Sequence, residues 1–155
     1  KGLDYLANQL KEIITSEIGE IQSKINLIGF SMGGLIARFY LQELEGYRVT
    51  RSFFSISAPH HGSILAYFAS NRGIRQMRPN SHFLKNLEQN SGRLQELKCY
   101  SYWTPFDLMI LPATSSIWRE AENIRVNSLC HPLMVRNQKI IADILVKSKP
   151  FASKV

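Results

Sequence analysis

The sequence predicts a single α/β domain with a mostly parallel β-sheet and helices on both of its faces. Apolar residues recur at intervals of three and four over residues 3–21, which is the period of a helix. The next segment, residues 24–30 (KINLIGF), is a short apolar run typical of a strand buried on both faces. A glycine-rich corner then leads into a second helical pattern. The order helix, strand, turn, helix indicates parallel strands with helices packed against them.

The rest of the chain continues this alternation. The second helical pattern stops at Gly46, where we expect a left-handed cap. Residues 63–98 contain helical fragments separated by glycine and proline, and they predict a helical cap or lid inserted into the domain. The further predicted elements are strands over residues 49–57, 97–103 and 123–130 and a closing helix over residues 138–147.

Composition narrows the classes of function. A length of 155 residues fits one domain, and no apolar stretch reaches the roughly 18 residues of a transmembrane helix. The net charge of +7 is scattered along the chain, and the densest basic segment, residues 72–78, contains no aromatic residue. Peripheral contact with a lipid interface therefore fits the charge better than nucleic-acid binding. The two cysteines, Cys99 and Cys130, have no metal-ligand or disulfide spacing and are expected to be free thiols.

The residues Gly29-Phe30-Ser31-Met32-Gly33 match the pattern G-x-S-x-G between a predicted strand and a predicted helix. A serine at the apex of such a turn has a strained backbone, and we expect side chains two residues before or after it to clash. The helix start offers the Met32 N–H to a developing oxyanion. Gly34 is expected to let the helix pack closely on the sheet. Ser31 is therefore the candidate nucleophile.

A serine nucleophile needs a base, and the base needs an orienting carboxylate. In this kind of site the chain order is serine, then acid, then histidine. Of three aspartates and four histidines, only Asp107 followed by His131 satisfies that order with an aspartate. Asp107 lies in a proline-containing loop after one predicted strand, and His131 directly follows another. The alternative acids are Glu96, Glu120 and Glu122.

At this point the sequence resembles the lipase-like α/β-hydrolases, which include bacterial triacylglycerol lipases and esterase relatives. The resemblance rests on NLIGFSMGGLIARFYLQEL, on a P-H-x-G-S segment at residues 59–63, and on the acid and histidine blocks TPFDLMILPATSS and CHPLMVRN. It covers about residues 26–144. It implies Ser31 as nucleophile, Asp107 as acid, His131 as general acid and base, and Met32 as an oxyanion donor.

The adjacent histidines His60 and His61 suggest a metal site, but neighbouring side chains point in different directions and no carboxylate pattern surrounds them. We therefore expect no metal and no cofactor, and a structural hydrogen bond near the serine turn for His60. Ser63 is expected to cap the following helix, and His82 to be exposed. Four apolar residues of the predicted lid fit either an acyl pocket or simple packing: Met77, Phe83, Leu84 and Leu87.

The resemblance departs from the family pattern at the amino terminus. The chain opens at Lys1 instead of a methionine, and 24 residues precede the strand at Ile25. These residues are taken up by a helix, so the early strands and the loop with the second oxyanion donor are expected to belong to a longer protein. The sequence thus predicts a partial hydrolase domain spanning residues 1–155.

The predicted activity is cleavage of carboxylic esters through an acyl-enzyme, with an ester or lipid as substrate. Two alternatives stay open. The first is a non-catalytic hydrolase-fold module that binds a partner. The second is an acyltransferase that uses the same three residues.

Overall fold

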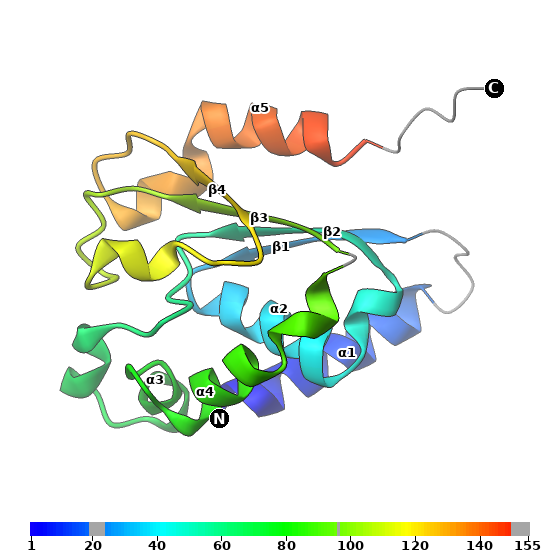
Figure 1. Ribbon diagram of the computed structural model, residues 1–155, viewed down its shortest axis with the longest axis horizontal. Helices are drawn as coiled ribbons and strands as arrows, with labels where there is room; N and C mark the ends of the chain where they lie inside the picture. The colour runs from blue at the N-terminus through cyan, green and yellow to red at the C-terminus, as the bar shows by residue number, and fades with distance from the viewer. Residues whose placement is uncertain (19–23, 96, 150–155) are drawn as a thin grey trace.

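A four-stranded parallel sheet forms the centre of the computed structural model, which describes residues 1–18, 24–95 and 97–149 (Figure 1). The strands are β1 (Ile25–Phe30), β2 (Thr50–Ile56), β3 (Lys98–Trp103) and β4 (Glu122–Arg125). They lie side by side in sequence order, and every neighbouring pair is parallel. The carboxyl ends of the strands therefore share one edge of the sheet, and the predicted α/β fold class is confirmed.

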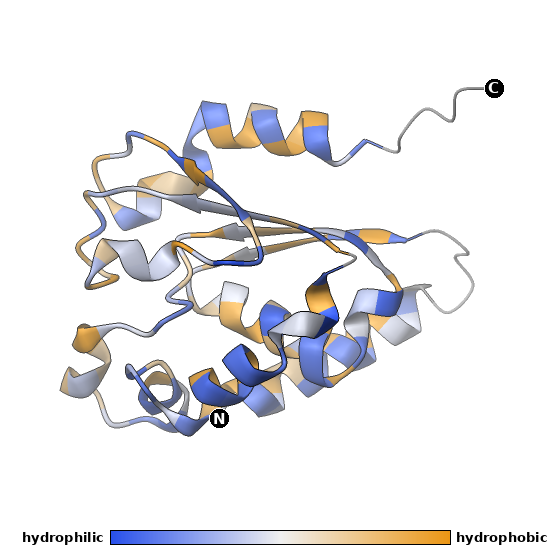
Figure 2. Ribbon diagram, in the orientation of Figure 1, coloured by the Kyte–Doolittle hydropathy of each residue, from blue (hydrophilic) through white to orange (hydrophobic). Residues whose placement is uncertain are grey.

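Helices cover both faces of this sheet (Figure 1). Helix α5 (Gln138–Lys147) lies on one face, with the bounds that the sequence predicts. Helices α1 (Leu3–Ile18) and α2 (Met32–Glu43) lie on the other. Polar and apolar residues alternate along α1 and α5, as expected for helices that bury one side (Figure 2).

Strand β2 shows how the two faces are filled. Phe53 and Phe54 are both fully buried and, as neighbours in a strand, point to opposite faces. Phe53 packs with residues of α1 and α2 and lies edge-on to Trp118, while Phe54 packs with Ile140 of α5. The sheet therefore lies between two apolar layers. These two layers position the loops that follow the carboxyl ends of the strands.

Strand β1 differs from its prediction in burial. It lies at one edge of the sheet as the described residues form it, and the Ile28 side chain is 55% exposed. The expectation of burial on both faces is wrong there, because no further strand or helix covers that side chain among the described residues. Of the predicted helix over residues 3–21, the last three positions lie outside the described residues.

Two other boundaries also differ. The left-handed residue after α2 is Glu45, with φ 62°, whereas Gly46 begins the short 3-10 helix η1 (Gly46–Arg48). Glycine is required at position 46 for another reason, because a Cβ there would lie 2.2 Å from the ring of Tyr40. Strand β4 ends at Arg125. The predicted strand to residue 130 is wrong, because the chain leaves the sheet after the Val126 N–H bonds to the carbonyl of Trp103.

The segment after β2 forms short helices that pack against α1 and α2. These are η2 (Ile64–Phe68), α3 (Arg72–Gln76), α4 (His82–Gln89) and η3 (Ser91–Leu94). Phe83, Leu84 and Leu87 are buried against Leu3 and Leu35, with Met77 packed beside them. This arrangement favours the packing interpretation of these four residues over an acyl pocket, while the role of the segment as a cap stays a prediction.

A buried arginine on α2 connects this segment to the loop after β3. The Arg38 side chain is fully buried and donates to the carbonyl of Leu87 and to the carboxylate of Glu88. Its guanidinium also lies 4.7 Å from the ring centre of Trp118. Burial lowers the pKa of Arg38, although Glu88 opposes the shift. The contacts of one side chain on α2 thus join α4 to the loop after β3.

None of the helices in the described ranges is both long enough and apolar enough to span a membrane.

Candidate active site

Ser31 lies at the sharp turn between β1 and α2, at the carboxyl edge of the sheet. Its backbone has φ 52° and ψ −124°, a region that residues with a side chain seldom occupy. Such a conformation costs on the order of 1–3 kcal/mol and persists only where the surroundings impose it. Here the Ser31 N–H donates to the carbonyl of Ile56 at 2.8 Å, and the Ser31 carbonyl accepts from Gly34 at 3.0 Å. Both the N–H and the C=O of the half-buried serine are therefore hydrogen-bonded, which holds its backbone in place.

Two glycines make this turn possible, and the sequence points to both: Gly29 through the motif and Gly34 through close packing of the helix on the sheet. A Cβ on Gly29 would lie 2.7 Å from the Cα of Gly34, and a Cβ on Gly34 would lie 2.4 Å from the Cβ of Ala58. A Cβ on Gly33, by contrast, meets no atom within 4 Å. The expected clash at Gly33 is wrong, because the first turn of α2 directs that position away from the sheet. Gly29 and Gly34 allow the close approach of strand and helix.

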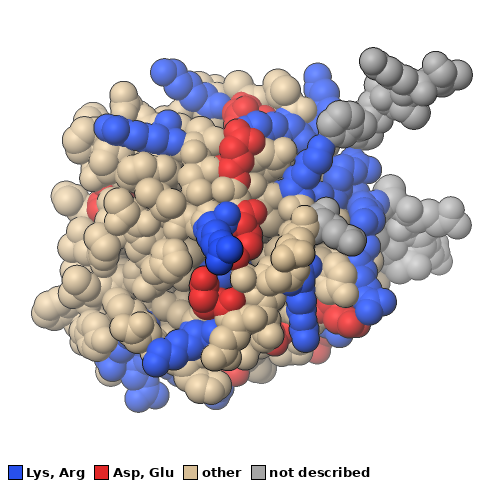
Figure 3. Space-filling model, in the orientation of Figure 1, with Lys and Arg blue, Asp and Glu red and all other residues tan. Residues whose placement is uncertain are grey.

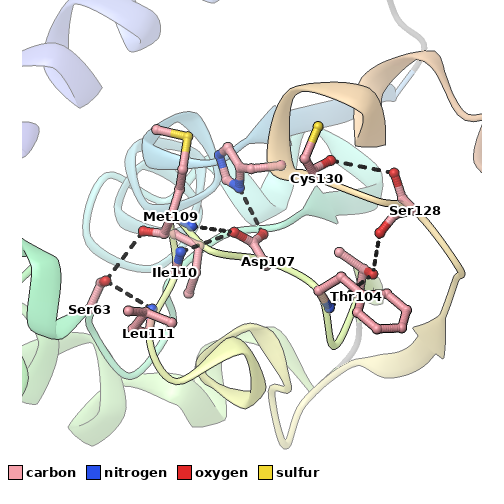
Figure 4. Close-up of polar contacts among 10 residues, drawn as sticks. Ser63, Thr104, Asp107, Met109, Ile110, Leu111, Ser128 and Cys130 are labelled. Atoms are coloured by element: carbon pink, nitrogen blue, oxygen red, sulfur yellow. Dashed lines mark hydrogen bonds and ion pairs between the residues drawn. The ribbon is translucent and has the colours of Figure 1, made fainter.

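Asp107 and His131 form a buried pair at the same edge of the sheet. The Oδ2 atom of Asp107 lies 2.7 Å from Nδ1 of His131, and both side chains are almost fully buried. The other carboxylate oxygen, Oδ1, accepts the backbone N–H groups of Met109 and Ile110 at 3.0 Å each (Figure 4). Three donors thus orient one carboxylate.

These contacts set the protonation state of Asp107. Burial by itself raises the pKa of this carboxyl, but the hydrogen bond and charge of His131 and the amides of Ile110 and Met109 together outweigh it. The pKa of Asp107 is therefore below its ordinary value. The carboxylate is ionised at neutral pH and faces the imidazole.

His131 packs against the residue that precedes Ser31. Its ring lies 4.7 Å from the ring of Phe30, centre to centre, and Phe30 is the residue directly before Ser31. His131 is the first residue of the 3-10 helix η5 (His131–Arg136). Five residues separate it from the end of β4, so it does not directly follow a strand as predicted. Across the described ranges, no hydrogen bond joins the Ser31 hydroxyl to His131.

The other acids have different partners. Glu122 pairs with Lys147, Asp143 accepts from the Tyr102 hydroxyl, and Asp4 pairs with Arg72. One buried carboxylate oxygen of Glu120 has no hydrogen bond among the described residues, and Glu96 lies outside them. Among the acids that the structure describes, Asp107 is therefore the one in contact with His131.

His60 lies behind the serine turn. Its Nε2 is 2.8 Å from the hydroxyl of Ser55, and its ring stacks on Trp118. Burial, then the positive charge of Arg38 and the neighbouring His61, lowers the pKa of His60 well below its usual value, so the ring is neutral. Ser55 in turn faces Gly34, since a Cβ on that glycine would lie 3.1 Å from its hydroxyl. His60 thus packs beneath the turn as a structural residue.

Metal ligands do not gather in the described part of the chain, where no group of three or more His, Cys, Asp or Glu side chains lies close enough to hold an ion. Cys99 is buried and Cys130 partly buried, and both are free thiols. Burial, partly opposed by Arg38, raises the pKa of Cys99 to about 12, which keeps this thiol protonated.

Sequence reasoning missed the contacts of two residues that hold the loop carrying Asp107. Thr104 donates from its buried hydroxyl to the carbonyl of Ser128, just before His131 (Figure 4). Ser63 was expected to cap a helix, but its side chain makes no capping bond and contacts the backbone of Met109 and Leu111 instead. Its place in the segment P-H-x-G-S is a signal that marks it, whereas nothing in the sequence marks the partner of Thr104.

The fold and this arrangement define the class of protein. A parallel sheet with a strained serine at a strand-to-helix turn belongs to the α/β-hydrolases. The sequence profile of the palmitoyl protein thioesterase family matches residues 2–104, and the chain belongs to this family. Comparison with curated protein sequences gives no match.

Solved structures of similar fold agree with the class. The mature form of the lipase BlEst2 from Bacillus licheniformis has a TM-score of 0.76 at 16% identity, over 97% of this chain and 76% of that one. Its propeptide form gives 0.71 at 16% identity, over 100% of this chain and 43% of that one. The monoacylglycerol lipase of Paleococcus ferrophilus gives 0.60 at 16%, covering 96% and 77% of the two chains. At these identities the likeness establishes the fold.

The two glycines of the serine turn give a matched test. Gly34→Ala is expected to lower the free energy of unfolding by about 1–3 kcal/mol, because its Cβ overlaps Ala58. Gly33→Ala is expected to raise it by up to about 1 kcal/mol, because alanine favours a helix and the space is open. Urea denaturation measures both. Equal effects of the two substitutions would contradict the packing described here.

The low pKa of Asp107 predicts a pH-dependent contribution to stability. A depressed folded pKa stabilises the protein above the unfolded value of about 3.9, and this stabilisation is lost as the pH falls through the folded pKa. Asp107→Asn is expected to lower the free energy of unfolding by about 1.5–3 kcal/mol at pH 7, because the charge beside His131 is lost. In urea titrations between pH 7 and pH 3, the difference from wild type should shrink below about pH 4. A difference that stays constant over this range would contradict the assignment.

Proposed function

We propose that this chain carries the catalytic centre of a serine hydrolase that cleaves ester or thioester bonds of long acyl chains. Ser31 is the nucleophile, His131 the general base and acid, and Asp107 the residue that orients and stabilises the imidazole. The observation that carries the proposal is the buried Asp107–His131 pair at the sheet edge where Ser31 occupies its strained turn. The family name supports an acyl thioester, and the lipase neighbours support an oxyester.

The chemistry follows from the roles of these groups. His131 removes the hydroxyl proton as Ser31 Oγ attacks the acyl carbonyl, and the Met32 N–H at the start of α2 stabilises the negative oxygen. His131 then gives the proton to the leaving alcohol or thiol as its bond to the acyl carbon breaks. Water attacks the acyl-enzyme with His131 again as base, which releases the acid and restores Ser31.

Exposed apolar residues around the edge support a lipidic substrate. Phe68 is 85% exposed and Leu129 82%, and they lie in loops after β2 and β4, with Leu108 exposed in the loop after β3. Further exposed apolar side chains occupy the same loops and the start of α2: Met32, Ile64, Leu65, Tyr67, Phe106, Met109 and Leu133. The part of the surface over the strand ends is largely free of charged residues (Figure 3). An apolar surface of this kind around a nucleophile suits acyl chains or the surface of a lipid aggregate.

The arginines of residues 72–78 support this interpretation over nucleic-acid binding. Arg72 pairs with Asp4, and Arg78 donates to the carbonyls of Ala66 and Ala69. Two of the three arginine charges are therefore used in holding α3 and η2 in place.

Transfer of the acyl group to an alcohol or amine instead of water is an alternative reaction that uses the same three residues. It is distinguished from hydrolysis by its products.

Replacing the nucleophile tests the assignment. Ser31→Ala is expected to abolish hydrolysis of p-nitrophenyl butyrate and labelling by a fluorophosphonate, because no other hydroxyl occupies the turn. Ser57→Ala is the matched control, since Ser57 also follows a strand with positive φ, but its buried hydroxyl has no hydrogen bond among the described residues. The control should keep wild-type activity. Labelling that persists in Ser31→Ala would refute the assignment.

The apolar surface gives a separate prediction on substrate. The double variant Phe68→Ser, Leu129→Ser is expected to lose about 100-fold or more in kcat/KM on micellar p-nitrophenyl palmitate, because two apolar contacts of about 1.5–3 kcal/mol each are lost. Hydrolysis of p-nitrophenyl acetate should not change. Leu145→Ser on α5, also an exposed apolar position, is the control. Equal losses on both substrates would argue against a lipid-binding role.

A further inference from the structure

The loop that carries Asp107 is held at both ends by side-chain hydroxyls. We define this acid loop as residues 104–111, from the residue after β3 to the residue before Pro112. At its start, the hydroxyl of Thr104 donates to the carbonyl of Ser128 at 2.8 Å. At its end, the N–H of Leu111 donates to the hydroxyl of Ser63 at 3.0 Å (Figure 4). Asp107 lies between these two attachments.

Ser63 contacts the acid loop at a second point. Its hydroxyl donates to the carbonyl of Met109 at 3.4 Å, so the one side chain bonds the backbone on both sides of Ile110. The neighbouring Ile64 N–H donates to the carbonyl of Leu111 at 2.9 Å, and the carbonyl of Gly62 accepts from the hydroxyl of Ser115. Ser63 is 4% exposed. Because Ser63 itself is buried, solvent does not replace the bonds of its hydroxyl without cost.

One peptide group connects Ser63 to the Asp107 carboxylate. The carbonyl of Met109, which accepts from Ser63, and the N–H of Ile110, which donates to Asp107 Oδ1, belong to the same peptide unit. A trans peptide is planar and directs its C=O and N–H in opposite directions. The position of the Ser63 hydroxyl therefore fixes the direction in which the Ile110 N–H meets the carboxylate. The chain of bonds then continues from Asp107 Oδ2 to His131.

We propose that Ser63 is a positioning residue that aligns the Asp107 carboxylate with His131 through the peptide between Met109 and Ile110. The inference rests on the proposed function for its catalytic consequence. Successive hydrogen bonds of this kind also polarise one another, which strengthens the bond from Asp107 to His131. The role explains why a serine stands at position 63 without capping η2.

The attachment at Thr104 makes the role of Ser63 local. Thr104 holds the start of the acid loop to the segment before His131, and the Asp107 N–H donates to the Thr104 carbonyl. Loss of the Ser63 hydroxyl therefore leaves the loop attached at its start by Thr104 and at its end by the Ile64 N–H alone, and loosens mainly residues 109–111. A structural defect of the whole domain is not expected.

The test compares three variants of the full chain. Ser63→Ala removes the hydroxyl, Ser63→Thr keeps it in an extended backbone that threonine favours, and Ser81→Ala is the control. The Ser81 hydroxyl likewise donates to one carbonyl, of Gln76, and accepts one N–H, of Leu84, but it caps α4 and does not contact the acid loop. The control thus loses the same number and kind of hydrogen bonds.

Two measurements separate positioning from stability. In hydrolysis of p-nitrophenyl butyrate, Ser63→Ala should lower kcat about tenfold with KM within about twofold of wild type, which is the loss expected for one hydrogen bond that acts in the transition state. In proton NMR, the low-field resonance of the His131 Nδ1 proton should shift or broaden. Ser63→Thr should restore both, and Ser81→Ala should change neither, although it lowers the melting temperature.

Each outcome either supports or overturns the positioning role of Ser63. The proposal is supported if kcat falls and the His131 resonance shifts or broadens in Ser63→Ala but in neither Ser63→Thr nor Ser81→Ala. An unchanged resonance in Ser63→Ala, or an equal loss in Ser63→Thr, overturns it. If the wild type shows no Ser31-dependent hydrolysis, the proposed function fails, and the resonance in Ser63→Ala then decides the positioning role by itself.

Discussion

The strained turn at Ser31 is the constraint on which the rest of the structure depends. A serine with φ 52° at the end of β1 is possible only where the strand and the following helix approach closely. Gly29 and Gly34 allow that approach, and the bond from Ser31 N–H to the carbonyl of Ile56 ties the turn to β2. Beneath it, His60 and Ser55 fill the space between α2 and the sheet.

The parallel sheet places the other candidate residues at the same edge as the serine. Because all four strands run in the same direction, the loops after β1, β2, β3 and β4 meet at one edge. They supply in turn Ser31, Ser63, Asp107 and His131. Sequence separations of 24 to 100 residues are spanned in this way by backbone pairing, because each of the four residues lies within seven positions of the end of its strand.

Much of this arrangement could be predicted from the sequence where the pattern is local. The motif around Ser31 and the helical periods of α2 and α5 depend on neighbouring residues. The required order of serine, acid and histidine is satisfied by one aspartate only. The length of β4 could not be predicted, because residues 126–130 are apolar enough for a strand and leave the sheet through tertiary contacts. The contacts of Ser63 and the burial of Arg38 also depend on segments distant in the sequence.

The proposed mechanism requires that an acyl group pass through Ser31. It is tested most directly by rapid quenching of the protein during hydrolysis of p-nitrophenyl palmitate, followed by mass spectrometry of its peptides. A palmitoyl adduct on Ser31 is expected to form before the steady state and to disappear as substrate is consumed. Turnover of the ester with no adduct, or with an adduct on another residue, would contradict it.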